Sequence, residues 1–199
     1  LAAVNQYLLF DYVPTPQCIF KNVHKLEPGT MLIVREGALR KKQFWSPPKT
    51  THKLTEKEAL VTLDRLFAES VSRQLVADVP LGVFLSGGID SSAVAVYATR
   101  ASAQTIDTFS IGFEEASFDE SRYAREVARH LGTRHHEEIV SSKDALDLVP
   151  NLAETLSEPV ADASVIPTLI LSRFARQSVT VALDGDGADE LFAGYSTFH

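Results

Sequence analysis

The chain has 199 residues, 45% hydrophobic and 23% charged, a composition typical of a folded domain with room for an appendage. Its 26 acidic and 19 basic residues give a net charge of −7, which disfavours nucleic acid or an anionic membrane as a partner. The single cysteine, Cys18, excludes an internal disulfide and a multi-cysteine zinc site. With no visible signal peptide and no apolar run of membrane-spanning length, we expect a cytoplasmic protein.

The first part of the chain is predicted to hold a helix and a β-hairpin. Apolar residues recur at helical spacing in residues 1–12, and Pro14 opposes any continuation of that helix. Residues 31–34 and 38–45 are rich in strand-forming side chains and flank a turn that contains Gly37. This pattern predicts a hairpin.

A linker follows the hairpin. Pro47 and Pro48 are adjacent, and neighbouring prolines oppose both a helix and a central strand. We therefore expect a domain boundary here, which divides the chain into residues 1–48 and 49–199. Because the chain begins with Leu1 rather than methionine, we also expect it to be a piece of a longer protein.

Beyond the linker, helical and strand patterns alternate. This alternation predicts an α/β fold in which helices cover a parallel sheet, and ligands of such sheets bind beyond the carboxyl ends of the strands. Capping boxes are expected at residues 55–58 and 117–120, each opening a helix. The predicted helices cover residues 55–75, 90–98, 117–131, 144–156 and 163–177, and the predicted strands cover residues 79–85, 105–112, 135–140 and 179–183.

A glycine-rich turn follows the first of these strands. It reads Ser86-Gly87-Gly88-Ile89-Asp90-Ser91-Ser92 and runs into an apolar helix. Free N–H groups at a helix N-terminus attract phosphate, and glycines let the backbone approach it. It is not a Walker A loop, because no lysine follows the glycines. A plain glycine turn capped by Asp90 is the simpler interpretation, but it leaves the three serines unexplained.

An acidic turn follows the last predicted strand. It reads Asp184-Gly185-Asp186-Gly187-Ala188-Asp189-Glu190, with a helix expected from Leu191. Alone, this pattern suits a solvated turn as well as a site. Beside a phosphate-binding turn it favours Mg²⁺, which takes one or two carboxylates together with phosphate oxygens and water. Asp90 and Asp189 are the expected ligands, and a third loop at residues 111–113 should lie at the same edge of the sheet.

Together these two turns resemble motifs of the synthetase domain of glutamine-dependent asparagine synthetases, members of the N-type ATP pyrophosphatase (PP-loop) family. The likeness continues through residues 110–113, 118–121, 135–137 and 158–162. Residues 12–14 and 26–29 resemble the end of the family's glutaminase domain. The resemblance thus implies a PP-loop fold for residues 49–199, the N-terminal portion of the ATP-binding domain, and a glutaminase-type tail plus linker for residues 1–48.

The chemistry that the resemblance implies is the synthesis of asparagine. The side-chain carboxylate of aspartate attacks the α-phosphorus of ATP, which releases pyrophosphate and gives β-aspartyl-AMP; ammonia derived from glutamine then displaces AMP. Asp184 and Gly185 would contact ATP, and Asp186 would be the acid involved in forming the adenylate. Asp90 and Asp189 would hold Mg²⁺. Pyrophosphate would be held by Ser86, Gly87, Gly88, Asp90, Ser91 and Ser92, and the adenosine site would be lined by Phe84, Leu85 and Ile111.

The chain also departs from the family pattern. Asp184 stands where the family commonly has serine, and Asp186 where asparagine synthetases commonly have glutamate. An additional carboxylate beside ATP repels it unless a cation compensates. The family's glutaminase uses an N-terminal cysteine, which Cys18 cannot be, and its catalytic lysine is expected beyond His199. We therefore expect the isolated chain to be inactive, and its partners to include the missing glutaminase domain and a possible second copy of the chain.

Two other functions remain open at this stage. One is a related PP-loop ligase or pyrophosphatase that acts on another carboxylate. The other is a non-catalytic homologue. Among the remaining polar residues, His135 and His136 are adjacent on a predicted strand and so point to opposite faces, which disfavours a metal site. Glu158 and Asp162 flank a proline turn, where they would face the amino-acid substrate or, for Asp162, cap a helix.

Overall fold

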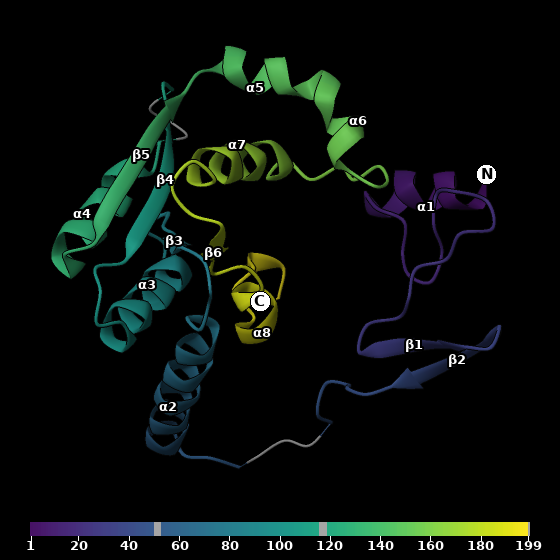
Figure 1. Ribbon diagram of the computed structural model, residues 1–199, viewed down its shortest axis with the longest axis horizontal. Coiled ribbons are helices and arrows are strands. Elements are labelled where there is room, and N and C mark those ends of the chain that lie inside the picture. The colour runs from purple at the N-terminus through teal and green to yellow at the C-terminus, as the bar shows by residue number, and fades with distance from the viewer. Residues whose placement is uncertain (50–52, 116–118, 199) are drawn as a thin grey trace. The chain divides into compact units, whose positions relative to one another are not determined.

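The structure is a computed structural model that describes residues 1–49, 53–115 and 119–198. It divides into two compact units (Figure 1). The first comprises Leu1–Lys53 together with Leu148–Ala163, and the second comprises Leu54–Asp147 together with Ser164–His199. Across the described ranges, no helix combines the length and the apolar character that crossing a membrane would require.

The first unit contains the predicted helix and hairpin. Helix α1 (Ala2–Phe10) ends where Asp11 adopts a left-handed conformation with φ 65°, several residues before the prolines. Strands β1 (Thr30–Arg35) and β2 (Ala38–Gln43) are antiparallel, and Arg35 pairs with Ala38. Glu36 and Gly37 form the two-residue turn with φ 51° and 77°, and positive φ at both positions matches the right-handed twist of a hairpin.

The prediction of one helix over residues 144–156 is wrong. The chain instead forms α5 (Ser142–Leu148), the short 3₁₀ helix η1 (Val149–Asn151) and α6 (Leu152–Thr155). The reason is Pro150, at the start of η1. Proline has no N–H to donate, and its ring clashes with the carbonyl group one turn earlier, so an α-helix cannot run through this position undistorted.

The second unit is built on a four-stranded sheet. Its strands are β3 (Leu81–Phe84), β4 (Asp107–Phe113), β5 (Arg134–Val140) and β6 (Val181–Leu183), in the order β5-β4-β3-β6. Every neighbouring pair is parallel, which confirms the predicted sheet. All four strands therefore end at the same edge.

Helices cover both faces of this sheet (Figure 1). On one face, α2 (Glu56–Gln74), α3 (Ile89–Ala101) and α4 (Ser121–Leu131) enclose a core with Val83 and Leu85. On the other, α7 (Val165–Ala175) packs on Phe109. Successive parallel strands joined through helices give the α/β architecture that the alternating pattern predicted.

Helix boundaries agree with several local signals. Thr55 and Glu58 form the predicted capping box of α2. Gly132 ends α4 with φ 68°, and Pro167 lies in the first turn of α7, where its missing N–H is tolerated. The second predicted capping box, residues 117–120, falls partly outside the described residues; α4 begins at Ser121, whose amide donates to Asp119 Oδ1 at 3.1 Å.

Candidate functional site

The turn after β3 is shaped by its own hydroxyl groups. Ser86 and Ser91 lie with their Oγ atoms 2.9 Å apart, and Ser91 Oγ also accepts from the Ser86 amide at 3.2 Å. Ser86 Oγ accepts from the Gly88 amide at 3.3 Å. Gly88 is the N-cap residue of α3, so the amides of the following residues form a first helical turn without intrahelical acceptors. Free N–H groups at a helix N-terminus are the donors that an anion site uses.

Gly87 is held by the start of α4. It has φ 86°, a conformation that disfavours residues with a side chain. A Cβ atom at this position would lie 2.5 Å from Tyr123 Cβ and 2.6 Å from the Ala124 amide nitrogen. Tyr123 and Ala124 therefore back the turn directly. Neither residue could be predicted, because nothing local in the sequence marks a helix that packs behind a glycine of a distant turn.

The acidic segment leaves the sheet beside this turn. Val83 pairs with Leu183, so the segments after β3 and β6 start side by side. A Cβ atom at Gly185 would lie 2.8 Å from the Ser91 amide nitrogen and 2.9 Å from the Asp90 carbonyl carbon. The structure thus brings the two motifs, more than ninety residues apart in sequence, into contact at one edge.

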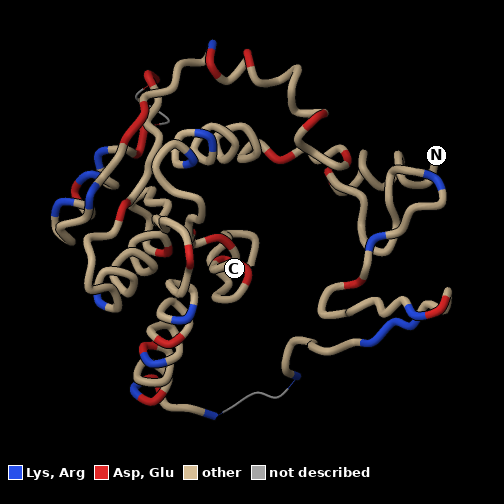
Figure 2. The backbone as a smooth tube through the Cα atoms, in the orientation of Figure 1, with Lys and Arg blue, Asp and Glu red and all other residues tan. Residues whose placement is uncertain are grey.

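The loop of the acidic segment is shorter in the structure than the sequence predicted. Helix α8 runs over Ala188–Phe192, so Asp189 is helical, and the prediction of a loop to Glu190 with a helix from Leu191 is wrong. The Asp186 amide donates to Asp184 Oδ1 at 3.1 Å, which makes a local turn. That turn and the left-handed Gly187, with φ 88°, let the helix begin earlier. In Figure 2 the aspartate and glutamate positions of this segment, close to the C-terminus, are coloured red on the backbone tube.

Asp90 and Asp189 are the two expected metal ligands. Within the described ranges, no group of three or more histidine, cysteine, aspartate or glutamate side chains is arranged to hold a metal ion. Asp189 lies against Gly194: a Cβ atom at Gly194 would be 1.9 Å from Asp189 Oδ1, and the Gly194 amide donates to Asp189 O at 3.0 Å. The assignment of Asp90 and Asp189 to Mg²⁺ stays a prediction.

The residues predicted to line an adenosine site are mostly parts of the core. Leu85 is 1% exposed and packs with the α3 side of the sheet, while Phe84 packs with Phe109 on the other side. Ile111 is not in a loop as expected, because β4 continues to Phe113 and residues 111–113 are its last three.

Glu158 and Asp162 belong to the other unit. Glu158 accepts a hydrogen bond from the Ile19 amide at 3.1 Å and forms an ion pair with Lys25. The hydrogen bond from the Lys25 ammonium holds the pKa of Glu158 below its ordinary value, because it stabilises the charged carboxylate. Asp162 lies in a hollow of about 360 Å³ lined by residues 10–12 and 160–163. Glu158 is thus occupied by contacts within the first unit.

The fold and this edge define an α/β domain of the PP-loop type: a parallel sheet with a Ser-Gly-Gly turn at the N-terminus of the helix that follows it. The chain belongs to the asparagine synthase family, whose model matches residues 62–199.

Curated relatives cover nearly the whole chain. Asparagine synthetase [glutamine-hydrolyzing] 1 of Bacillus subtilis is 34% identical over 98% of this chain and 31% of its own length. A putative asparagine synthetase [glutamine-hydrolyzing] 2 of Methanocaldococcus jannaschii is 36% identical over 98% of this chain and 38% of its own. The chain therefore spans about a third of the length of these relatives. Among solved structures, an NH3-dependent NAD synthetase from Campylobacter jejuni is matched with a TM-score of 0.48 and 16% identity, over 68% of this chain and 60% of that one.

Proposed function

We propose that this chain is the nucleotide-binding part of an ATP-dependent amide ligase that makes asparagine. The observation that supports the proposal is the contact of Gly185 with Asp90 and Ser91 in a chain of this family, because two turns that share one nucleotide must lie side by side. The relatives are described as glutamine-hydrolysing asparagine synthetases, and that description supplies the reaction class.

The reaction proceeds in two displacements. An oxygen of the aspartate side-chain carboxylate forms a bond to the α-phosphorus of ATP, and the bond from that phosphorus to the bridging oxygen of pyrophosphate breaks. Ammonia derived from glutamine then attacks the carbonyl carbon of β-aspartyl-AMP. The C–O bond to AMP breaks, a proton leaves the nitrogen, and asparagine is released. The domain's task is to orient ATP and to stabilise charge on the leaving groups.

The Ser86–Ser92 turn would hold the pyrophosphate portion. First-turn amides of α3 offer N–H donors, and the partial positive charge of the helix end favours an anion. The hydroxyl groups of Ser86 and Ser91, 2.9 Å apart, already fix the turn, so binding costs little reorganisation there. The complete set proposed for pyrophosphate is Ser86, Gly87, Gly88, Asp90, Ser91 and Ser92.

The remaining ATP contacts would come from the neighbouring strand ends. Phe84, Leu85 and Ile111 would border adenosine, chiefly through backbone groups for the first two, because their side chains lie in the core. Asp184 and Gly185 would contact the nucleotide, and Asp186 would act in adenylate formation.

Mg²⁺ would be held by Asp90 and Asp189. The donor chemistry fits, since Mg²⁺ in such sites needs only one or two carboxylates beside phosphate oxygens. When bound, the ion neutralises charge on the leaving pyrophosphate. The carboxylate of Asp184 would repel ATP unless a cation held at this site compensated for its charge.

The whole protein would work with a glutaminase domain in the same polypeptide, of which residues 1–48 would be the tail. Its substrates would be aspartate and ammonia derived from glutamine, and it would act in the cytoplasm, with self-association possible. No nucleic-acid or membrane partner is proposed, in keeping with the net charge of −7.

The test is pyrophosphate release by the full-length protein with ATP, Mg²⁺ and ammonia. We expect release only when aspartate is present, with asparagine formed in equal amount. If ATP binds but another carboxylic acid is needed for release, the protein is a different PP-loop ligase. If the folded protein does not bind ATP, it is a non-catalytic homologue. The isolated chain should not form asparagine in the same assay.

A further inference from the structure

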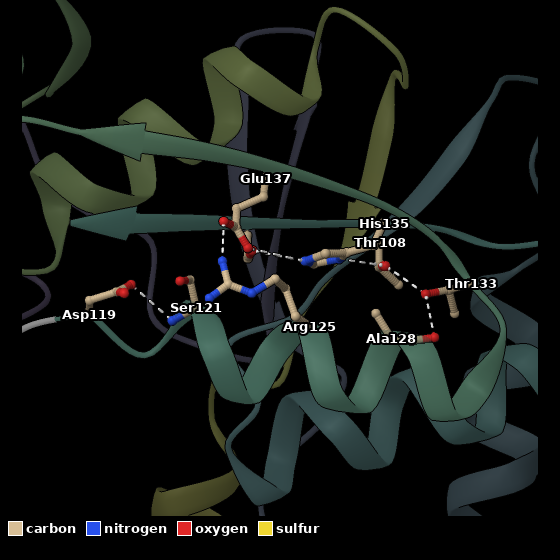
Figure 3. Close-up of polar contacts among 9 residues, drawn as sticks. Thr108, Asp119, Ser121, Arg125, Ala128, Thr133, His135 and Glu137 are labelled. Atoms are coloured by element: carbon tan, nitrogen blue, oxygen red, sulfur yellow. Dashed lines mark hydrogen bonds and ion pairs between the residues drawn. The ribbon is translucent and has the colours of Figure 1, made fainter. Parts of the chain in front are cut away.

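A polar network lies between α4 and the sheet (Figure 3). Arg125 on α4 donates from Nη1 to Glu137 Oε1 on β5 at 2.6 Å. The other carboxylate oxygen, Oε2, lies 3.9 Å from His135 Nε2. The ring of His135 is held between two hydroxyl groups, Thr108 Oγ1 at 3.0 Å from Nδ1 and Ser110 Oγ at 3.1 Å from Nε2.

The network is partly buried, so the charge of Glu137 depends on where Arg125 lies. Thr108 and Ser110 are 0% and 3% exposed, and the side chain of Glu137 is 18% exposed. Within the described residues, Glu137 Oε2 is buried and accepts no hydrogen bond, so Arg125 is the main compensation for that charge. Apolar contacts tolerate small shifts of a helix, whereas a charged hydrogen bond at 2.6 Å depends on position and direction.

The start of α4 is also the wall behind the candidate phosphate turn. Tyr123 and Ala124, which come directly before Arg125, back Gly87 at the distances given above. The same end of the helix lies against β4: a Cβ atom at Gly112 would be 3.1 Å from Ser121 Cβ. A shift of α4 therefore changes the space available to Gly87.

We propose that Arg125 and Glu137 are positioning residues for the Ser86–Ser92 turn. Their ion pair fixes where α4 lies along its own axis and how it is rotated about that axis. Tyr123 and Ala124 then contact Gly87 from that fixed position. The consequence for ATP rests on the proposed function, but the coupling between the pair and the turn does not. Neither side chain touches the nucleotide in this account.

The chain contains a matched control. Arg134 pairs with Asp107 at 3.3 Å across the first residues of β5 and β4, the opposite end of these strands from the turn. The acids of the two pairs are 18% and 20% exposed, and the arginines 52% and 64%. Arg125→Met and Arg134→Met thus each remove one arginine–carboxylate pair, the first at the middle of β5 and the second at its start. Asp107 keeps its contact with His136 Nε2 at 2.8 Å when Arg134 is replaced.

The test compares these variants in the full-length protein. The first readout is amide hydrogen exchange of residues 86–92 without nucleotide, and the second is the dissociation constant for ATP. We expect Arg125→Met to speed exchange in the turn and to weaken ATP binding by about fivefold, a modest coupling of sites, while Arg134→Met leaves both unchanged. The charge-swapped double variant Arg125→Glu with Glu137→Arg should restore slow exchange.

Three outcomes are informative. Equal effects of Arg125→Met and Arg134→Met would overturn the proposal, because both pairs would then be merely structural. If wild-type protein binds no ATP but exchange still separates the two variants, the positioning role stands and the proposed function fails. If Arg125→Met does not fold, Glu137→Gln, which keeps the shape of the side chain, replaces it, and unchanged exchange in that variant would contradict the proposal.

Discussion

Gly185 touches Ser91 across the carboxyl edge of the sheet: a Cβ atom at residue 185 would lie 2.8 Å from the Ser91 amide nitrogen. Such a distance leaves no room for a side chain, and the two nearest atoms that it would meet belong to the backbone. The contact joins the acidic segment to the first turn of α3. It follows from sheet order, since β3 and β6 are hydrogen-bonded neighbours although they are far apart in the chain.

Replacement of this glycine tests the contact. Gly185→Ala should lower the free energy of unfolding by about 1–3 kcal/mol, because the added methyl group forces backbone apart. Denaturant titration measures this, and ATP affinity should fall in parallel. Gly88→Ala is the control for stability, since a Cβ atom there meets only Ser86 Oγ at 3.4 Å. Equal losses of stability in the two variants would contradict the close approach.

Asp184→Ser tests the charge of the acidic segment. Serine removes one carboxylate from the neighbourhood proposed for ATP but still accepts a hydrogen bond from the Asp186 amide, as Asp184 does at 3.1 Å. We expect ATP to bind more tightly, by up to about tenfold at low salt, and the gain to shrink as salt screens the charges. Titration calorimetry at two ionic strengths measures the dissociation constant for ATP in both proteins. Weaker binding in the variant would show that Asp184 assists ATP, through a cation or otherwise.

His135 should make stability depend on pH. Burial lowers its pKa below the ordinary 6.5, with the charge of Glu137 opposing that shift in part. Between the two pKa values the unfolded chain binds a proton that the folded chain does not, so the unfolding free energy falls as pH drops below about 6.5. The loss is complete once pH is below the folded pKa.

The corresponding variant is His135→Gln, whose amide offers a donor and an acceptor to the same hydroxyl groups. Urea unfolding between about pH 5.5 and 7.5 should show a smaller slope than wild type. His130→Gln, at an exposed position of α4, is the control and should keep the wild-type slope. If both variants keep the wild-type slope, a group other than His135 makes the free energy of unfolding depend on pH.

Lys25→Met should loosen the first unit locally. It leaves Glu158 without the ammonium that stabilises its charge, while the Ile19 amide still donates to it at 3.1 Å. Because the pKa of Glu158 is lowered in the folded chain, its contribution to stability is present above its ordinary pKa and is lost as pH falls through the lowered value. Exchange of the Ile19 amide should therefore be faster in the variant at neutral pH. In wild type the protection factor of this amide, which corrects for the slower intrinsic exchange in acid, should fall on acidification. An unchanged protection factor would argue against the ion pair.

The sequence predicted most of the local structure, because the signals were local. Gly37 between two strand-like runs gave the hairpin, Thr55 with Glu58 gave the start of α2, and Gly132 gave the end of α4. The alternating pattern was enough for a parallel sheet. Pro150 should have divided the helix expected over 144–156, since its effect on a helix is equally local.

Long-range placement was harder to predict. Apolar residues of α2 differ widely in exposure: Leu60 and Leu63 are 60% and 40% exposed, while Val71 lies in the core. Helical periodicity identifies an apolar face but not what covers it. For the same reason the association of residues 148–163 with the first unit, and of Tyr123 with Gly87, could not be read from spacing.

The Ser86–Ser92 turn and the Asp184–Glu190 segment are proposed to bind one nucleotide together. Amide hydrogen exchange of the full-length protein, with and without ATP and Mg²⁺, is the decisive measurement, because each segment reports separately. Exchange should slow in both segments over the same range of ATP concentration. Protection of only one segment, or of neither while ATP is demonstrably bound, would contradict it.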